Sequence, residues 1–346
     1  MYAETITVIL PTYRRPQLLK RAIASVLAQT YPHFLLYIYD NASGDETEEV
    51  VRAFQQRDSR IHYHRHPENI GSLANFAYGI ERVQTPYFSV FSDDDHLLPT
   101  LFATALATYR NYPDAGIVAL SQIERTEEGR VIHVGLHTRK PFEYYPAPEG
   151  TAQVFQSDFP AWTSILYATH AVRNQKPYLT SNFFHDVYFN YQIAYRSGIA
   201  LVNQPGAIYT HHAACFSAQY SHRKRIENLH DVLRLLPQVG LLPSALESQV
   251  NVLFTREFFD RCLHSGLKSL ALGDLETAAF ALDSLSTVKP RTPSTRLFRS
   301  LYALQKAVPS TRYALASLLR IRKLLKRWLL WLHFLGSFPP ADVPNF

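Results

Sequence analysis

Apolar runs and helix-like repeats alternate along the first 120 residues of the chain. The runs predict buried strands, and the segments between them place apolar residues at helical spacing. The predicted strands are residues 5–10, 34–39, 60–65, 86–91 and 116–120, and the predicted helices are 17–29, 45–55, 72–82 and 98–109. Strands that alternate with helices in this way predict an α/β fold with a mostly parallel sheet.

Polar residues collect where these strands end. They include Thr12-Tyr13-Arg14, Asp40-Asn41, Asn69 and Asp93-Asp94-Asp95. In parallel sheets the ligand crevice lies outside the carboxyl ends of the strands, so one cleft gathers all four groups. No strand is followed by a G-x-G-x-x-G turn or a Walker-type lysine loop, which argues against the usual dinucleotide and P-loop sites.

The three consecutive carboxylates need a compensating charge, because like charges at close range raise each other's pKa unless a cation lies among them. Asp93 and Asp95, two residues apart on an extended chain, point to the same side and can reach one ion. Oxygen ligands of this kind suit Mg²⁺ or Mn²⁺. A solvated acidic turn is the alternative interpretation.

The pattern becomes helical from about residue 216. We expect three parts: an α/β domain over residues 1–215, a helical extension over 216–288, and a basic tail over 289–346 with an amphipathic helix at 312–335. One apolar stripe of that helix consists of Ala314, Leu318, Ile321, Leu325, Trp328, Leu332 and Leu335. We favour contact of this stripe with a membrane surface, while packing on the protein and a homodimer seam stay open.

The distribution of charge limits the kinds of partner that the protein could bind, and the cysteines and the first residues bear on its cellular compartment. The net charge is +6, but residues 289–346 hold eleven Lys and Arg and one acid, which leaves the rest mildly acidic and argues against a nucleic-acid partner. The two cysteines have no zinc-like spacing. The first residues lead directly into a strand without the regions of a secretory signal, so we expect a cytoplasmic protein, peripheral on the inner face of the plasma membrane if the stripe binds lipid.

Five local patterns together resemble the family 2 glycosyltransferases, which bind nucleotide-sugars in the GT-A fold. They are residues 8–16 (VILPTYRRP), 25–32 (SVLAQTYP), 40–47 (DNASGDET), 69–75 (NIGSLAN) and the D-x-D at 93–95 (DDD). The resemblance covers residues 5 to 215. It implies a GT-A-type, mostly parallel sheet flanked by helices, to which the C-terminal helical extension is added.

The same resemblance implies a set of site residues. Nucleotide-sugar binding falls to Pro11, Thr12, Tyr13, Arg14, Asp40, Asn69, Gly71, Asn75, Asp93 and Asp94. The ligands of Mn²⁺ or Mg²⁺ would be Asp95, Asp93, His211 and His212. Asp40 would accept the N3–H of a uracil or thymine ring, and Asp186 would be the catalytic base.

Several of these residues have structural alternatives. Asp40 could cap the following helix, and Asp186 could be a first-turn acid that the helix dipole favours. Of His211 and His212, one is expected to pack against the protein and the other to reach the metal. His62, His64 and His66 invite a zinc interpretation but fit a solvated strand face better, and Trp162 is as much a core aromatic as a sugar platform.

The resemblance implies a metal-dependent, inverting glycosyltransferase acting in cell-surface polysaccharide synthesis. The donor would be a UDP- or dTDP-sugar and the acceptor a hydroxyl of a glycan or lipid-linked sugar. The chemistry needs a cation that neutralises the diphosphate leaving group and a carboxylate that deprotonates the acceptor. The chain supplies a carboxylate cluster that would hold the cation and a separate carboxylate for the base. A nucleotidyltransferase and a non-catalytic sugar-nucleotide-binding scaffold stay open as alternatives.

Overall fold

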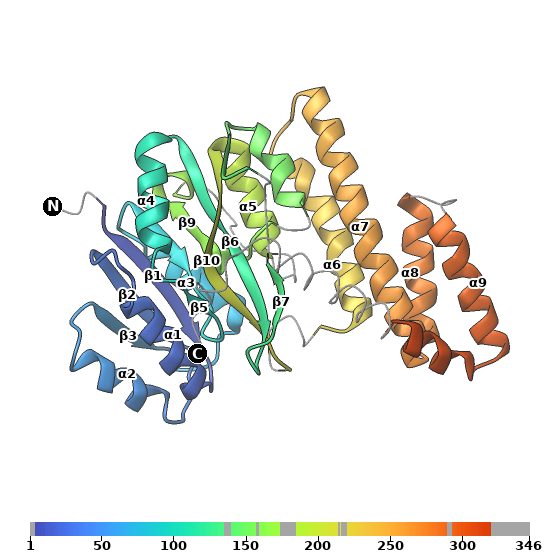
Figure 1. The fold of residues 1–346 in the computed structure, drawn as a ribbon, viewed down its shortest axis with the longest axis horizontal. Coiled ribbons are helices and arrows are strands. Elements are labelled where there is room, and N and C mark those ends of the chain that lie inside the picture. The colour runs from blue at the N-terminus through green and yellow to red at the C-terminus, as the bar shows by residue number, and fades with distance from the viewer. Residues whose placement is uncertain are drawn as a thin grey trace. The chain divides into compact units, whose positions relative to one another are not determined.

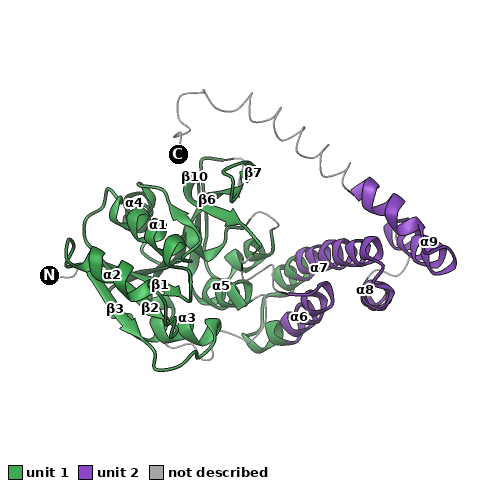
Figure 2. Ribbon diagram, turned by 90° about the horizontal axis from the view of Figure 1, so that it is seen from below, with its two compact units in different colours: residues 1–215, 235–250 green, residues 216–234, 251–346 purple. Residues whose placement is uncertain are grey.

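The computed structural model describes residues 4–134, 140–156, 159–173, 185–213, 215, 220–288 and 293–319 (Figure 1). The chain divides into two compact units, residues 1–215 with 235–250 and residues 216–234 with 251–346 (Figure 2). The further division of the helical part at residue 288 stays a prediction. Of the predicted amphipathic helix, residues 312–319 are described and helical, and residues 320–335 lie outside the described residues.

The described strands of the first unit form one ten-stranded sheet. Its order is β3-β2-β1-β4-β9-β6-β10-β5, with β7 paired to β6 and β8 paired to β10. The strands are β1 (Ile6–Thr12), β2 (Phe34–Asp40), β3 (Ile61–Arg65), β4 (Tyr87–Val90), β5 (His96–Leu97), β6 (Ala115–Thr126), β7 (Val131–Val134), β8 (Phe142–Tyr145), β9 (Ile165–Ala168) and β10 (Gly198–His211).

The sheet has a parallel part and an antiparallel insertion. Strands β3, β2, β1 and β4 are parallel neighbours, as are β6 and β10. Strand β9 lies between β4 and β6 and runs antiparallel to both. It comes from the region after residue 121, where the sequence shows no clear period, so this strand was not anticipated.

Helices cover both faces of the sheet because its strands are apolar on both. The α/β unit contains α1 (Pro16–Leu27), α2 (Thr47–Gln55), α3 (Ser72–Glu81), α4 (Leu101–Asn111) and α5 (His185–Arg196), and short 3₁₀ turns η1 (Glu149–Phe155), η2 (Trp162–Ser164) and η3 (Thr169–Ala171). All seven residues of β1 are buried. Ile6, Val8 and Leu10 join a core with α1 and α4. Ile9 lies on the opposite side, against α3.

Glycine at position 79 permits the close packing of α3 on the sheet. A Cβ added at Gly79 would lie 2.4 Å from Cγ2 of Ile9 and 2.9 Å from the ring of Tyr39. Any larger residue would force the helix away from β1 and β2. The register then aligns the carboxyl ends of the parallel strands, with Thr12 opposite Asp40 and Asp40 opposite Arg65.

The second unit is helical. It is built from nearly all of α6 (His222–Leu235), most of α7 (Ser244–Leu272), α8 (Leu275–Val288), α9 (Pro293–Ala307) and the helical residues 311–319. The 3₁₀ turn η5 (Leu236–Gln238) follows α6 in the chain and belongs to the first unit. Phe298 of α9 packs over Gly266 of α7, where a Cβ would lie 2.4 Å from its ring. Among the described residues, no helix is long and apolar enough to cross a membrane.

Candidate functional site

The acidic triplet follows β4 after two residues, Phe91 and Ser92. Asp93 and Asp95 are buried, with exposed fractions of 1% and 4%, whereas Asp94 is partly exposed. Thr12, the last residue of β1, donates its hydroxyl hydrogen to Oδ2 of Asp93 over 2.6 Å. The triplet therefore lies at the carboxyl edge of the parallel strands, where the sequence predicted it.

Arg15 is the cation nearest to the triplet. Its Nη2 lies 2.7 Å from Oδ1 of Asp93, and its Nη1 lies 2.9 Å from Oδ2 of Asp94. One guanidinium thus bridges two adjacent carboxylates from the loop between β1 and α1. Arg15 lies within the pattern of residues 8–16 but has no predicted role, although a basic residue that can reach a strand-end carboxylate cluster was the available signal.

A single guanidinium does not compensate the triplet fully. Burial raises the pKa of Asp93 to about 7, with repulsion from Asp94 acting in the same direction and Arg15 and Thr12 opposing it. Burial and repulsion from Asp94 also raise the pKa of Asp95 well above its usual value. Two buried carboxylates with raised pKa values form a site that a further cation would stabilise.

Asp95 connects three segments of the sheet. Its Oδ2 accepts a hydrogen bond from the hydroxyl of Thr163 over 2.6 Å, and its Oδ1 accepts from the backbone N–H of Thr210 over 3.0 Å. Thr163 belongs to η2 and Thr210 to β10. Neither threonine was singled out from the sequence, because both are remote in the chain and hydroxyl residues carry no motif there.

The two neighbouring histidines have different partners. Nε2 of His212 lies 3.0 Å from Oδ2 of Asp94. Nε2 of His211 lies 2.8 Å from Oε2 of Glu124, on β6. Burial acts to raise the pKa of Glu124, but its contact with His211 helps to hold that pKa below the usual value. The structure therefore brings His212 and not His211 to the triplet.

Asp94, His212 and Cys215 form a group that could hold a metal ion. One ligand atom from each lies within 4.8 Å of the others. In the described part of the chain, this is the set of three or more His, Cys, Asp or Glu residues whose ligand atoms lie so close together. Cys215 accepts from the N–H of His212 and donates to the carbonyl of Thr210. Burial raises the pKa of its thiol to about 11, so the sulfur is neutral at physiological pH. A carboxylate and an imidazole then remain as ligands, next to two buried carboxylates, and this set fits Mn²⁺ better than Zn²⁺.

Asp40 is buried at the end of β2 and accepts three hydrogen bonds. Its Oδ1 accepts from the backbone N–H and the hydroxyl of Ser43, over 2.9 and 2.5 Å, and its Oδ2 accepts from the hydroxyl of Tyr63 over 2.7 Å. Helix α2 begins seven residues later, at Thr47, and the hydroxyl and N–H of Thr47 bond to Asp45. Asp40 thus shapes the loop after β2 and does not cap the helix.

The same loop holds the segment after β1. The backbone N–H of Arg14 donates to the hydroxyl of Ser43, and Nε of Arg14 donates to the carbonyl of Ser43. Arg14 has a φ of 52°, in the left-handed region, so this contact maintains an uncommon backbone conformation. Pro11 is buried within β1, whereas Tyr13 and Arg14 are exposed at the strand ends.

An asparagine network organises the segment before α3. Oδ1 of Asn41 accepts from the N–H of Ile70, and Nδ2 of Asn41 donates to Oδ1 of Asn69. Oδ1 of Asn69 also accepts from the N–H of Gly71, whose φ of 86° suits glycine. Asn69 and Gly71 are exposed, as a ligand-binding loop requires.

Asn75 occupies a different environment. It is buried, donates from Nδ2 to the carbonyl of Tyr39 over 2.8 Å, and contacts Nε2 of His66 over 2.9 Å. These contacts tie α3 to the end of β2 and give Asn75 a structural role. Its predicted contact with the nucleotide stays a prediction.

Asp186 lies in the first turn of α5, where its Oδ1 accepts from the N–H of Val187. The neighbouring His185 packs against Trp162, with ring centroids 4.8 Å apart. Thr163, the residue after Trp162, bonds to Asp95. A short run of contacts therefore joins the triplet to the start of α5. Trp162 is buried among aromatic rings, which gives it a packing role.

The alternating histidines His62, His64 and His66, in β3 and directly after it, do not form a metal site of three ligands. His66 is buried against Asn75, and His64 and His62 stack on Tyr78 and Tyr37, with centroids 5.0 and 4.6 Å apart. The imidazoles pack on aromatic rings of the sheet and of α3. The zinc interpretation therefore has no geometry to support it.

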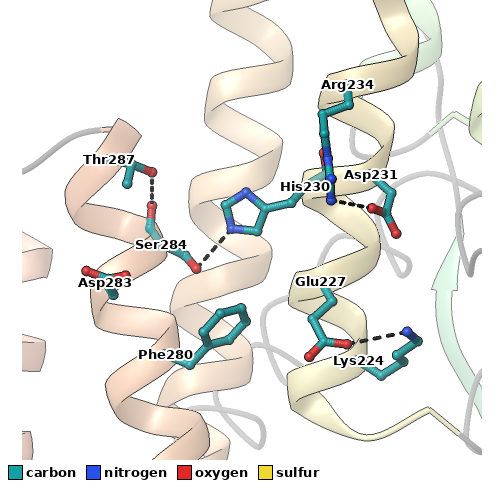
Figure 3. Close-up of a pocket in the computed structure, with 9 residues that line it drawn as sticks. All are labelled: Lys224, Glu227, His230, Asp231, Arg234, Phe280, Asp283, Ser284 and Thr287. Carbon is teal, nitrogen blue, oxygen red and sulfur yellow. Dashed lines mark hydrogen bonds and ion pairs between the residues drawn. The ribbon is translucent and has the colours of Figure 1, made fainter.

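A groove of about 480 Å³ lies between α6 and α8 in the helical unit (Figure 3). It is lined by Lys224, Glu227, His230, Asp231, Arg234, Phe280, Asp283, Ser284 and Thr287. Figure 3 shows two ion pairs along α6: Lys224 lies 3.4 Å from Glu227, and Arg234 lies 2.6 Å from Asp231. It contains none of the predicted site residues, so the candidate active site is the carboxyl edge of the sheet.

Sequence comparison with known proteins matches this chain to sugar-transferring enzymes. The profile of glycosyl transferase family 2 matches residues 7–179. The chain is 31% identical over 90 residues to the putative teichuronic acid biosynthesis glycosyltransferase TuaG of Bacillus subtilis, which is 26% of this chain and 36% of the relative. It is 30% identical over 102 residues to the GalNAc(5)-diNAcBac-PP-undecaprenol beta-1,3-glucosyltransferase of Campylobacter jejuni, which is 29% of this chain and 33% of that enzyme. The matched part thus spans about a third of these relatives.

Solved structures share the fold over most of the chain. S. aureus TarS in complex with UDP-GlcNAc has a TM-score of 0.63 at 15% identity and covers 91% of both chains. The mannosyltransferase PcManGT of Pyrobaculum calidifontis, in complex with GDP-Man and Mn²⁺, has a TM-score of 0.50 at 13% identity and covers 93% of this chain and 86% of its own. At such identities the likeness shows the fold alone, and this is the GT-A fold predicted from the sequence.

Proposed function

This chain belongs to glycosyl transferase family 2, and from that premise we propose that it transfers a sugar from a UDP- or dTDP-linked donor to a hydroxyl of a glycan or lipid-linked acceptor, with a divalent ion and with inversion. The observation that carries the proposal is the acidic triplet at the carboxyl edge of the sheet. Its two buried carboxylates and the nearby Asp94–His212 pair make a site for a cation at the ends of the parallel strands.

The residues present fit Mn²⁺ or Mg²⁺. We assign Asp94 and His212 as ligands because their atoms are grouped, and we retain Asp95 and Asp93 as the buried carboxylates of the D-x-D. His211 is left out because it pairs with Glu124. A bound ion would neutralise charge on the leaving diphosphate as a Lewis acid. The Mn²⁺ in the complex of PcManGT supports the use of a divalent ion.

The donor's nucleotide would lie across the ends of β1 and β2. Thr12 ends β1, Tyr13 and Arg14 follow it, and Asp40 ends β2. Asp40 already accepts three hydrogen bonds, but two carboxylate oxygens offer about four acceptor sites, which leaves capacity for the N3–H of a pyrimidine. The UDP-GlcNAc bound by TarS supports a uridine donor.

Asp186 is the proposed general base. It is separate from the triplet in the sequence, and the contact between Trp162 and His185 joins its segment to the residues around Asp95. A positioned carboxylate that removes the acceptor proton contributes roughly 10²–10⁴-fold in rate. A single base opposite the leaving group gives inversion at the anomeric carbon. The acceptor class rests on the name of the Campylobacter relative, which contains an undecaprenol-linked acceptor.

Calorimetric titration of UDP, dTDP, GDP and ADP, with and without Mn²⁺, tests the site. We expect one pyrimidine diphosphate to bind, and only with Mn²⁺. Asp95→Asn should abolish that binding, whereas Glu127→Gln, an exposed acid on the β6–β7 turn, should leave it unchanged. Binding of none of the four would refute the nucleotide site.

The released product tests the reaction class. Turnover with release of nucleoside diphosphate supports sugar transfer. Release of pyrophosphate would identify a nucleotidyltransferase, and binding without turnover across a panel of glycan and lipid-linked acceptors would indicate a scaffold.

A further inference from the structure

Three basic residues lie near Asp95 at one side of the α/β unit. They are Arg21 of α1, His96 of β5 and Arg125 of β6. In the sheet, β10 lies between β5 and β6, so the three residues come from neighbouring elements. The proposed transfer reaction assigns no role to any of them.

The register of the sheet places Arg125 and His96 on the same face. Ile208 of β10 pairs with His96 of β5 and with Ile123 of β6. Side chains of directly opposed residues share a face of the sheet. Arg125 follows Ile123 by two positions, so its side chain leaves the same face. The two basic side chains are therefore on one side of β10.

Helix α1 brings Arg21 to the same place. The backbone N–H of Leu97 donates to the hydroxyl oxygen of Ser25 over 3.2 Å, which holds α1 beside β5. Arg21 lies one turn before Ser25 on the same side of the helix, and His96 directly precedes Leu97. Burial lowers the pKa of His96, and the charges of Arg125 and Arg21 lower it further, as expected if both guanidinium groups are close to it.

The two guanidinium groups have no counter-charge of their own. Burial and the charge of Arg21 lower the pKa of Arg125, while Asp95 acts in the opposite direction. The carboxylate of Asp95 is already engaged by Thr163 and by the N–H of Thr210. Within the ranges that the structure describes, neither arginine forms an ion pair. Two like charges that are held close together repel, and a bound anion would offset this repulsion.

The chemistry of the pair fits a phosphate group. A guanidinium presents a planar fork of N–H donors that matches two phosphate oxygens. A phosphate dianion supplies two negative charges for the two guanidinium groups and enough acceptor oxygens for both forks. Arg21 is exposed and Arg125 is half-buried, so a ligand can reach them from solvent.

We propose that Arg21 and Arg125 bind a phosphate group of a substrate, beside the cation site at the acidic triplet. Two sources supply this chemistry in the proposed reaction, namely the diphosphate of the donor and a phosphate of a lipid-linked acceptor. The identity of the source rests on the proposed function, whereas the phosphate site itself does not.

Titration of inorganic phosphate into the full chain, followed by phosphorus NMR in the presence of a chelator, tests the site. We expect phosphate to bind the original chain, and to bind the double variant Arg21→Gln, Arg125→Gln at least about tenfold more weakly, because charge-assisted hydrogen bonds are lost. Lys20→Gln with Arg57→Gln is the matched control, because it removes the same charge from two exposed positions outside this group, and it should bind as the original chain does. Circular dichroism verifies that each variant is folded.

The same titration in the presence of saturating UDP and Mg²⁺ identifies the source. Exclusion of inorganic phosphate by UDP would assign the site to the diphosphate of the donor. Phosphate that still binds to the UDP complex, and does so through the two arginines, would assign the site to a phosphate of the acceptor.

Three results would overturn the proposal. They are no binding of phosphate to the original chain, equal binding to the double variant, and an equal loss in the control variant, which would reduce the effect to overall charge. Failure of UDP to bind the original chain is a separate result, because it would refute the proposed donor site and leave the phosphate titration decisive for the two arginines.

Discussion

Replacing Arg15 with glutamine removes the guanidinium that bridges Asp93 and Asp94, at 2.7 and 2.9 Å. Loss of one partner from a buried ion pair costs about 3–5 kcal/mol. The Arg15 side chain is 28% exposed, so solvent replaces part of the lost interaction. We therefore expect the α/β unit to lose about 2–3 kcal/mol of unfolding free energy above about pH 8, without divalent ions.

The loss of unfolding free energy in the Arg15→Gln variant should depend on pH because Asp93 titrates. Its pKa is about 7 in the folded chain, against an ordinary value near 3.8. Between these values the unfolded chain binds fewer protons than the folded one, so this group's contribution to stability falls as pH rises from about 4 to 7. Without Arg15 the folded pKa rises further. At about pH 5 Asp93 is protonated in the folded state of either protein, so the variant's deficit should be small there and develop above pH 7.

Urea denaturation followed by circular dichroism in the presence of a chelator measures both effects. Lys20→Gln removes an equal charge from the exposed side of α1 and serves as the control. A deficit of the same size at about pH 5 and pH 8.5, or one below about 0.5 kcal/mol at the higher pH, would refute the role assigned to Arg15 as the counter-charge of Asp93.

The other predictions concern the proposed base, the metal ligands and the packing of α3. Asp186→Asn should leave nucleotide binding unchanged in calorimetry and lower kcat roughly 10²–10⁴-fold, and retained transfer would assign the base to another residue. His212→Ala should weaken Mn²⁺ binding at least about tenfold in a direct titration, whereas His211→Ala, which removes contacts with Glu124 and Tyr209, should leave it unchanged; the reverse order would exchange their roles. Gly79→Ala should cost about 1–3 kcal/mol in urea denaturation, because its Cβ would lie 2.4 Å from Ile9 Cγ2, and an unchanged midpoint would show that α3 can shift without cost.

Local patterns were sufficient to predict the core of the α/β unit. The apolar run of β1 is buried at every position, as expected for a strand covered on both faces. The amphipathic repeat of α1 buries Leu19, Ile23 and Val26 against it. These features depend on residues a few positions apart, which is the range over which periodicity and turn chemistry act. The triplet could be placed at a strand end for the same reason, because it lies only a few positions after the apolar run of its strand.

The site, in contrast, is assembled from contacts that no local pattern specifies. Thr163 and Thr210 reach Asp95 across 68 and 115 positions of the chain, and His212 reaches Asp94 across 118. Even the choice between His211 and His212 could not be made from the sequence, because adjacent residues of a strand end point to opposite sides.

The sequence by itself determined which segments become strands and helices and which chemical groups are available at the strand ends. Only the tertiary structure decided that β9 enters antiparallel between β4 and β6, that Arg15 supplies a counter-charge, and that His212 faces the triplet. The physical reason is that burial and charge compensation depend on three-dimensional neighbours. The free energy that selects those neighbours is a property of the packed sheet as a whole.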